Sequence, residues 1–158
     1  MPLSFFDTCA LQHKYVTGPH SRRIRSLVTK TSTTSYISEW TVVEMASALS
    51  NRCRQGSLPN SAYDAMNRQF LKDIAEGRLN VRPLAPPELQ RARQLIRYAG
   101  VLGRNRISSG DALVATCCLD LALAEQQRVV FYTSDRKLYN VLTTIDAFKK
   151  AVKLTLVL

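Results

Sequence analysis

The sequence is short of the residues from which many protein metal and disulfide sites are built. Its 158 residues include only four cysteines, Cys9, Cys53, Cys117 and Cys118, and none of them stands in a CxxC or Cys/His spacing that would hold zinc. A metal–thiolate site is therefore not expected. Because Cys9, Cys117 and Cys118 have apolar neighbours, where free cysteine behaves as a small hydrophobe, a reducing cytoplasm is the simplest setting.

Long apolar runs are also missing. No stretch approaches the ~18 apolar residues of a membrane span. The short apolar run at the amino terminus is interrupted by Asp7 and has no basic region before it, so it does not match a signal peptide. We expect a cytoplasmic protein without a membrane segment.

Acidic residues are scarce relative to basic ones. Twelve Asp and Glu stand against 22 Lys and Arg, which gives a formal charge of +10. This balance favours a polyanionic partner such as nucleic acid, and a solvated basic face is the alternative explanation. Apolar residues make up 46% of the chain, as in folded globular proteins, and the length is that of a single domain.

Strand and helix patterns alternate along the chain without internal repeats. The predicted strands are residues 3–6, 36–38, 79–82, 129–132 and 153–157. The predicted helices are residues 8–16, 20–29, 41–55, 61–76, 86–102, a nearly all-apolar helix from 111 onward, and 136–148. Such alternation favours a parallel sheet in an α/β sandwich.

Four acidic residues stand at junctions between these elements. Asp7 and Asp135 follow the strands 3–6 and 129–132, Asp111 opens the apolar helix, and Glu44 lies in the first turn of another helix. The carboxyl ends of parallel strands meet helix amino ends at one edge of the sheet. The four acids are therefore expected to converge on one acidic site.

Each acid also has a purely local explanation. Asp7 and Asp135 are suitable helix caps. Glu44 stands three residues after Thr41, and Asp111 three residues after a serine, so each could complete a capping box. Of the four acids, Glu44 has the least local support as a site residue, because it lies off the apolar stripe of its helix. Asp111 is the only charged residue in the first turn of an apolar helix, and this calls for a further reason.

The chemistry of a carboxylate cluster favours a hard metal ion. Carboxylates at helix amino ends stay ionised, and several together repel one another unless a cation lies between them. Oxygen ligands without histidine or cysteine suit Mg²⁺ or Mn²⁺, which keep bound waters and often contact phosphate. A basic rim around such a centre favours phosphodiester hydrolysis.

Several segments resemble a known family. Residues 6–11, 38–49, 109–113 and 132–138 are similar, in order and spacing, to the successive motifs of PIN-domain ribonucleases, and the resemblance is nearest to the VapC-type toxins of toxin–antitoxin pairs. It implies a three-layer α/β sandwich with a central, mainly parallel sheet, in which residues 1–158 form a single PIN-like nuclease domain. Cys9 departs from the family, which commonly has serine there, and Thr17 and Gly18 replace an often acidic residue.

The resemblance also implies an activity. It assigns Asp7, Glu44, Asp111 and Asp135 as the catalytic, metal-binding acids and Thr133 as a supporting hydroxyl. The implied reaction is hydrolysis of RNA by water activated on Mg²⁺ or Mn²⁺. The implied partners are RNA, a cognate antitoxin protein and a second copy of the chain.

Basic residues provide candidate contacts to these partners. Arg104 and Arg106 precede Asp111 in a basic loop and are the expected contacts to substrate phosphate, although solubility explains either one taken alone. The arginines at 22, 23 and 25 offer a surface to the acidic tail of an antitoxin.

Two other functional classes remain open. A HAD-like phosphatase also begins with a strand that ends in aspartate, but its nucleophile motif needs a second aspartate two residues later, where this chain has Cys9. A catalytically silent PIN module that binds nucleic acid or a partner would keep the basic surface without cleavage. Loss of several acids would favour this alternative, and all four are present.

Overall fold

A five-stranded parallel sheet forms the centre of the protein. The computed structural model describes residues 1–103 and 106–157. Its strand order is β3-β2-β1-β4-β5, and every paired neighbour is parallel. The strands are β1 (Leu3–Phe6), β2 (Thr34–Ser38), β3 (Asn80–Arg82), β4 (Val129–Thr133) and β5 (Val152–Leu156). The predicted α/β fold with a mainly parallel sheet is confirmed.

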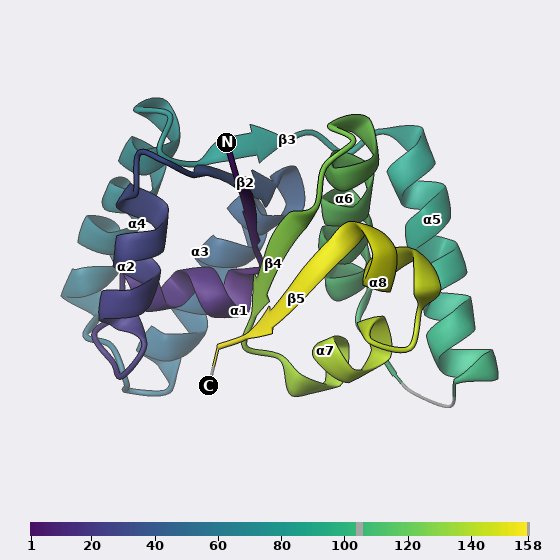
Figure 1. Cartoon of the computed structure of the whole chain (residues 1–158). Coiled ribbons are helices and arrows are strands. Elements are labelled where there is room, and N and C mark those ends of the chain that lie inside the picture. Colours follow the sequence, from purple (N-terminus) through teal and green to yellow (C-terminus); the bar gives the residue numbers. More distant parts are fainter. Residues whose placement is uncertain (104–105, 158) are drawn as a thin grey trace.

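Helices cover both faces of this sheet (Figure 1). On one side lie α1 (Thr8–Leu11), a 3-10 turn (Gln12–Lys14), α2 (Ser21–Thr29), α3 (Glu39–Arg54) and α4 (Asn60–Ala75). On the other lie α5 (Pro86–Arg97), a π-helical turn (Tyr98–Leu102), α6 (Ser109–Ala124), α7 (Arg136–Leu142) and α8 (Asp146–Ala151). Within the described residues, no helix has the length and apolar character needed to cross a membrane.

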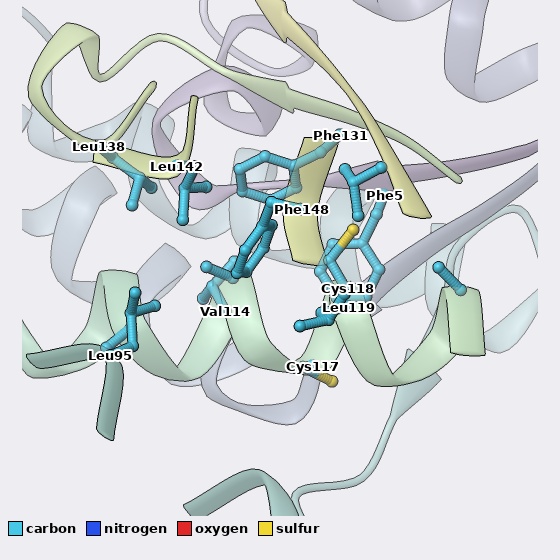
Figure 2. Packing of buried hydrophobic residues seen from close by; sticks show 14 of the residues in the cluster. Phe5, Leu95, Val114, Cys117, Cys118, Leu119, Phe131, Leu138, Leu142 and Phe148 are labelled. Atoms are coloured by element: carbon cyan, nitrogen blue, oxygen red, sulfur yellow. The ribbon is translucent and has the colours of Figure 1, made fainter. Parts of the chain in front are cut away.

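Alternating aromatic residues of the central strands build a core on each face. Phe5 and Phe131 pack with α5, α6 and α8 on one side, whereas Phe6 and Tyr132 pack with α1 to α4 on the other. This alternation follows from the two-residue period of a strand. Figure 2 shows the first core, in which Phe148 of α8 lies with Phe5 and Phe131 against α6. Because α6 is buried on nearly all sides, its amino end is held at a fixed place.

The start of α3 differs from the prediction. The helix begins at Glu39, and Ser38 at the end of β2 caps it by accepting a hydrogen bond from the Thr41 amide at 3.1 Å. Thr41 therefore lies inside the first turn, and the predicted capping box of Thr41 with Glu44 does not form. The capping hydroxyl comes from the strand end, so Glu44 lies beyond the first turn.

The predicted helix 136–148 is also two helices rather than one. α7 ends at Leu142 and α8 starts at Asp146. The intervening Thr143 and Thr144 donate side-chain hydrogen bonds to the carbonyls of Asn140 and Val141, at 2.7 Å each. Threonine hydroxyls that bond to nearby carbonyls compete with helix continuation, which accounts for the break.

Candidate active site

The predicted site residues come from the carboxyl edge of the sheet and the helices that begin beside it. Asp7 directly follows the central strand β1, and Asp135 follows the neighbouring strand β4 by two residues. Glu44 lies on α3, which starts directly after β2, and Asp111 lies in the first turn of α6. The fold thus brings together residues far apart in the sequence.

Asp7 is the most buried of the four acids. The residue is 3% exposed, and its Oδ2 accepts hydrogen bonds from Thr133 Oγ1 and Cys9 Sγ, both at 2.8 Å. Burial raises the pKa of Asp7 to about 6, while the two hydrogen bonds oppose this shift. The negative charges of Asp111 and Glu44 raise the pKa further, so these three acids share one electrostatic environment.

Cys9 lies inside the site, and pattern reasoning assigned it no role. Besides its bond to Asp7, its sulfur accepts a hydrogen bond from the Ser134 amide at 3.1 Å and lies 3.3 Å from Thr133 Oγ1. Burial, and then the charge of Asp7, raise the pKa of the Cys9 thiol above its usual range. The neutral thiol is therefore a hydrogen-bond donor to Asp7, as a serine hydroxyl would be.

Thr133 connects two of the predicted acids. Its hydroxyl donates to Asp7 and accepts a hydrogen bond from the Asp135 amide at 3.0 Å. The side chain is fully buried, which fixes the hydroxyl at the end of β4. Asp7 and the backbone of Asp135 are thus held relative to each other by one side chain.

Glu44 is held between α1 and α6. Its Oε2 accepts a hydrogen bond from Thr8 Oγ1 at 2.7 Å. Its Oε1 lies so close to Gly110 that a Cβ at position 110 would overlap it. The carboxylate therefore lies against the first turn of α6, where the helix dipole favours negative charge. Sequence reasoning missed the contacts of Thr8 and Gly110, although both residues adjoin predicted aspartates.

Asp111 and Asp135 do form the local contacts that the pattern allowed. Asp111 Oδ2 accepts a hydrogen bond from the Ser108 amide at 3.2 Å, and the Asp111 amide donates to Ser108 Oγ at 3.0 Å. Asp135 Oδ1 accepts from the amides of Lys137 and Leu138 at 2.7 and 3.0 Å. These caps use one carboxylate oxygen of each aspartate, so capping and a second role are compatible.

The donor set is suited to a hydrated hard cation. Among residues 1–103 and 106–157, no three acidic, histidine or cysteine side chains are close enough to form a ready-made metal cage. Mg²⁺ does not need one, since it keeps several waters and is commonly held by one or two carboxylates. Repulsion from Asp111 and Glu44 adds to the effect of burial in raising the pKa of Asp7, and a cation relieves repulsion of this kind. The residues present therefore fit this class of ion.

The structure describes only one of the two arginines that are predicted to contact substrate phosphate. Arg106 is exposed in the segment that leads into α6. Arg104 lies outside the described residues. A basic side chain is thus available to solvent two residues before Ser108, the residue that caps α6.

The fold resembles those of solved toxin structures. No family profile matches this chain, and no curated protein does. The Rickettsia felis VapBC2 complex bound to a promoter DNA fragment contains a chain of 17% identity, with 97% of each chain covered and a TM-score of 0.58. DNA-bound VapBC from Salmonella typhimurium gives 15% identity, 98% coverage of each chain and a TM-score of 0.62.

A third neighbour has a named RNA target. Mycobacterium tuberculosis VapC20, a toxin that cleaves the sarcin–ricin loop, is 16% identical over 80% of this chain and 86% of its own, with a TM-score of 0.54. The chain therefore has the PIN-like fold of VapC-type toxins, as the sequence motifs predicted.

Proposed function

We propose that this chain is a Mg²⁺- or Mn²⁺-dependent endoribonuclease that hydrolyses RNA phosphodiester bonds and is the toxin of a toxin–antitoxin pair. The observation that carries the proposal is the buried Asp7 carboxylate at the carboxyl edge of the sheet, whose pKa is raised chiefly by burial and further by the charges of Asp111 and Glu44. Three acids on separate elements share this site on a protein of formal charge +10. The fold of an RNA-cleaving toxin supports the same reaction.

Each site residue has a distinct part in this proposal. Asp7, Glu44, Asp111 and Asp135 would hold the metal ion, directly or through water. When bound, the ion supplies an activated water for attack on phosphorus. Thr133 and Cys9 hold Asp7 through its Oδ2, and Thr8 orients Glu44.

The basic residues of the chain would bind the substrate. We infer that Arg104 and Arg106 contact phosphates of the RNA. Neutralising phosphates in this way gives affinity without reading sequence. Binding is therefore expected to weaken as salt concentration rises.

Protein partners form the second part of the proposal. The Rickettsia and Salmonella neighbours are VapBC assemblies on DNA, which supports a cognate antitoxin and a cytoplasmic location. A pocket of about 390 Å³ between α5, α6 and α8 has the exposed apolar side chains Tyr98 and Leu123 in its lining, and further exposed apolar side chains stand elsewhere on α5 and the π-helical turn. Apolar surface of this kind marks protein interfaces, and it supports a homodimer of single-domain chains spanning residues 1–158. The large exposed apolar side chains of α5, the π-helical turn and α6 are Leu89, Ile96, Tyr98, Val101 and Leu123.

A catalytically silent PIN module that binds nucleic acid or a partner is the alternative. It is favoured by the helix-capping roles of Asp111 and Asp135, because a cap needs no metal. A nuclease cleaves the RNA, whereas a silent module binds it and leaves it intact, so one assay separates the two functions.

The deciding experiment incubates the purified protein with end-labelled single-stranded RNA and Mn²⁺ or Mg²⁺. We expect metal-dependent cleavage that EDTA stops and that Asp7→Asn lacks. RNA that is shifted on a native gel but stays intact in both proteins would reject the nuclease and support the silent module.

A further inference from the structure

Trp40 is the only tryptophan of the chain, and its indole nitrogen is buried without a hydrogen bond. The residue lies in the first turn of α3, four positions before Glu44. Residues four apart share one face of a helix, so the indole and the carboxylate lie on the same side of α3. Among the described residues, Trp40 Nε1 has no hydrogen-bond partner.

Gly110 places this nitrogen next to the Glu44 carboxylate. A Cβ at position 110 would overlap Glu44 Oε1 and would come within 2.6 Å of Trp40 Nε1. Both atoms therefore lie over the same backbone carbon at the start of α6. Glu44 Oε1 is a charged acceptor beside a buried donor.

The energies favour a bond between these two groups. The tryptophan N–H is a donor only, and leaving a buried donor without a partner is destabilising. A hydrogen bond to an ionised carboxylate is among the stronger kinds. The other oxygen of the carboxylate, Oε2, is already held by Thr8 Oγ1 at 2.7 Å.

We propose that Trp40 is a positioning residue that clamps Glu44 together with Thr8. The indole N–H donates to Oε1 after a small rotation of the two side chains, while the Thr8 hydroxyl holds Oε2. Gly110 leaves the space in which the two side chains meet. The clamp itself depends only on geometry, whereas its purpose, to present Glu44 to a metal ion, rests on the proposed function.

Nuclear magnetic resonance tests the clamp without any metal or substrate. With a single tryptophan, ¹⁵N-labelled protein gives a single indole N–H resonance. We expect Glu44→Gln to move this resonance upfield, because a charged acceptor is replaced by a neutral one. The matched control, Glu125→Gln at the exposed carboxyl end of α6, should leave it in place. An indole resonance that ignores Glu44→Gln would overturn the proposal.

Metal affinity tests the purpose of the clamp. Trp40→Phe removes the N–H, and benzothienylalanine incorporated at position 40 replaces that N–H with sulfur at nearly the same shape, which controls for lost packing. We expect both to weaken Mn²⁺ binding by about tenfold, the effect of disturbing a partner of a metal ligand, and to lower kcat for RNA with KM unchanged. Calorimetry measures the affinity independently of activity.

The outcomes distinguish a failure of the role proposed for Trp40 from a failure of the proposed nuclease activity. Unchanged Mn²⁺ affinity in the folded isostere would overturn the role of Trp40 in presenting Glu44 to a metal ion and leave the proposed nuclease intact. If the wild-type protein bound no Mn²⁺, the nuclease proposal would fail, and the indole resonance would still decide whether Trp40 holds Glu44.

Discussion

Thr133 Oγ1 donates a hydrogen bond of 2.8 Å to Asp7 Oδ2 across 126 positions of sequence. The bond is possible because β1 and β4 are parallel neighbours whose register pairs Phe6 with Tyr132. The Asp7 amide also donates to the Tyr132 carbonyl at 3.0 Å. The buried carboxylate is thus fixed by the sheet itself rather than by a loop.

Asp7→Asn is expected to abolish RNA cleavage while it preserves the fold. Asparagine has the same size, but its amide is a poor ligand for a hard cation. The measurement is the cleavage rate with saturating Mn²⁺, with circular dichroism to verify folding. Asp146→Asn, at an exposed position at the start of α8, is the control and should cleave at the wild-type rate. Wild-type cleavage by Asp7→Asn would exclude the proposed site.

The metal-free protein is expected to lose stability as pH rises through about 6. The pKa of Asp7 in the folded protein is about 6, above its ordinary 3.8, so folding favours the protonated form. The contribution of the neutral carboxyl is fully present below pH 3.8 and is lost as pH rises through the folded value.

Urea denaturation in EDTA at pH 4.5 and pH 7.5 measures this loss, which should be on the order of 2 kcal/mol. Asp7→Asn should remove that part of the pH dependence, and added Mg²⁺ should reduce it in the wild type by binding the ionised form. A wild-type pH dependence that Asp7→Asn leaves unaltered would show that another group is responsible.

Gly110→Ala is expected to impair both folding and cleavage. In an ordinary helix this change stabilises by about 1 kcal/mol, but here the new methyl group would overlap Glu44 Oε1. The carboxylate must therefore move. The control is Gly100→Ala, where a Cβ meets nothing within 4 Å. Melting temperatures and Mn²⁺ affinities should fall for the first variant only, and an equal response of both would contradict the close contact.

Glu44→Gln is expected to keep its melting temperature within a few degrees and to weaken Mn²⁺ binding and cleavage by about tenfold. Since Ser38 caps α3, Glu44 has no capping role to lose, and glutamine still accepts a hydrogen bond from Thr8. Calorimetry with Mn²⁺ and an RNA cleavage assay check the prediction. Normal metal affinity and normal cleavage would reduce the proposed site to three aspartates.

The backbone arrangement was predictable because it follows from the hydrophobic period of each segment and from the points where strands lead into helices. Alternation of apolar runs and helix patterns gave the parallel sheet, and the position of Asp7 directly after a strand placed it at the carboxyl edge. The same rule placed Asp135 beside it. These inferences need only the direction of the strands, which the alternation determines.

The side-chain contacts within the site were not predictable in the same way. The bond from Thr8 to Glu44 and the contact of Glu44 with Gly110 join elements that are 36 or more residues apart, and they depend on rotamers and helix placement. The capping box assigned to Thr41 was wrong because the serine at the end of β2 supplied the cap first. Sequence pattern alone cannot decide which of two nearby hydroxyls caps a helix when the first residue of the helix is not known.

The central position of β1 in the sheet has a consequence for the growing chain on the ribosome. β1 precedes the other strands in the chain, yet one of its two neighbours, β4, follows the helices α1 to α6. Until β4 has emerged, one edge of β1 stays without its partner strand and Asp7 lacks the Thr133 hydroxyl. The acidic site therefore stays incomplete on the ribosome until β4 has emerged, and any activity that needs Asp7 held by Thr133 begins only after residues 129–133 have been made.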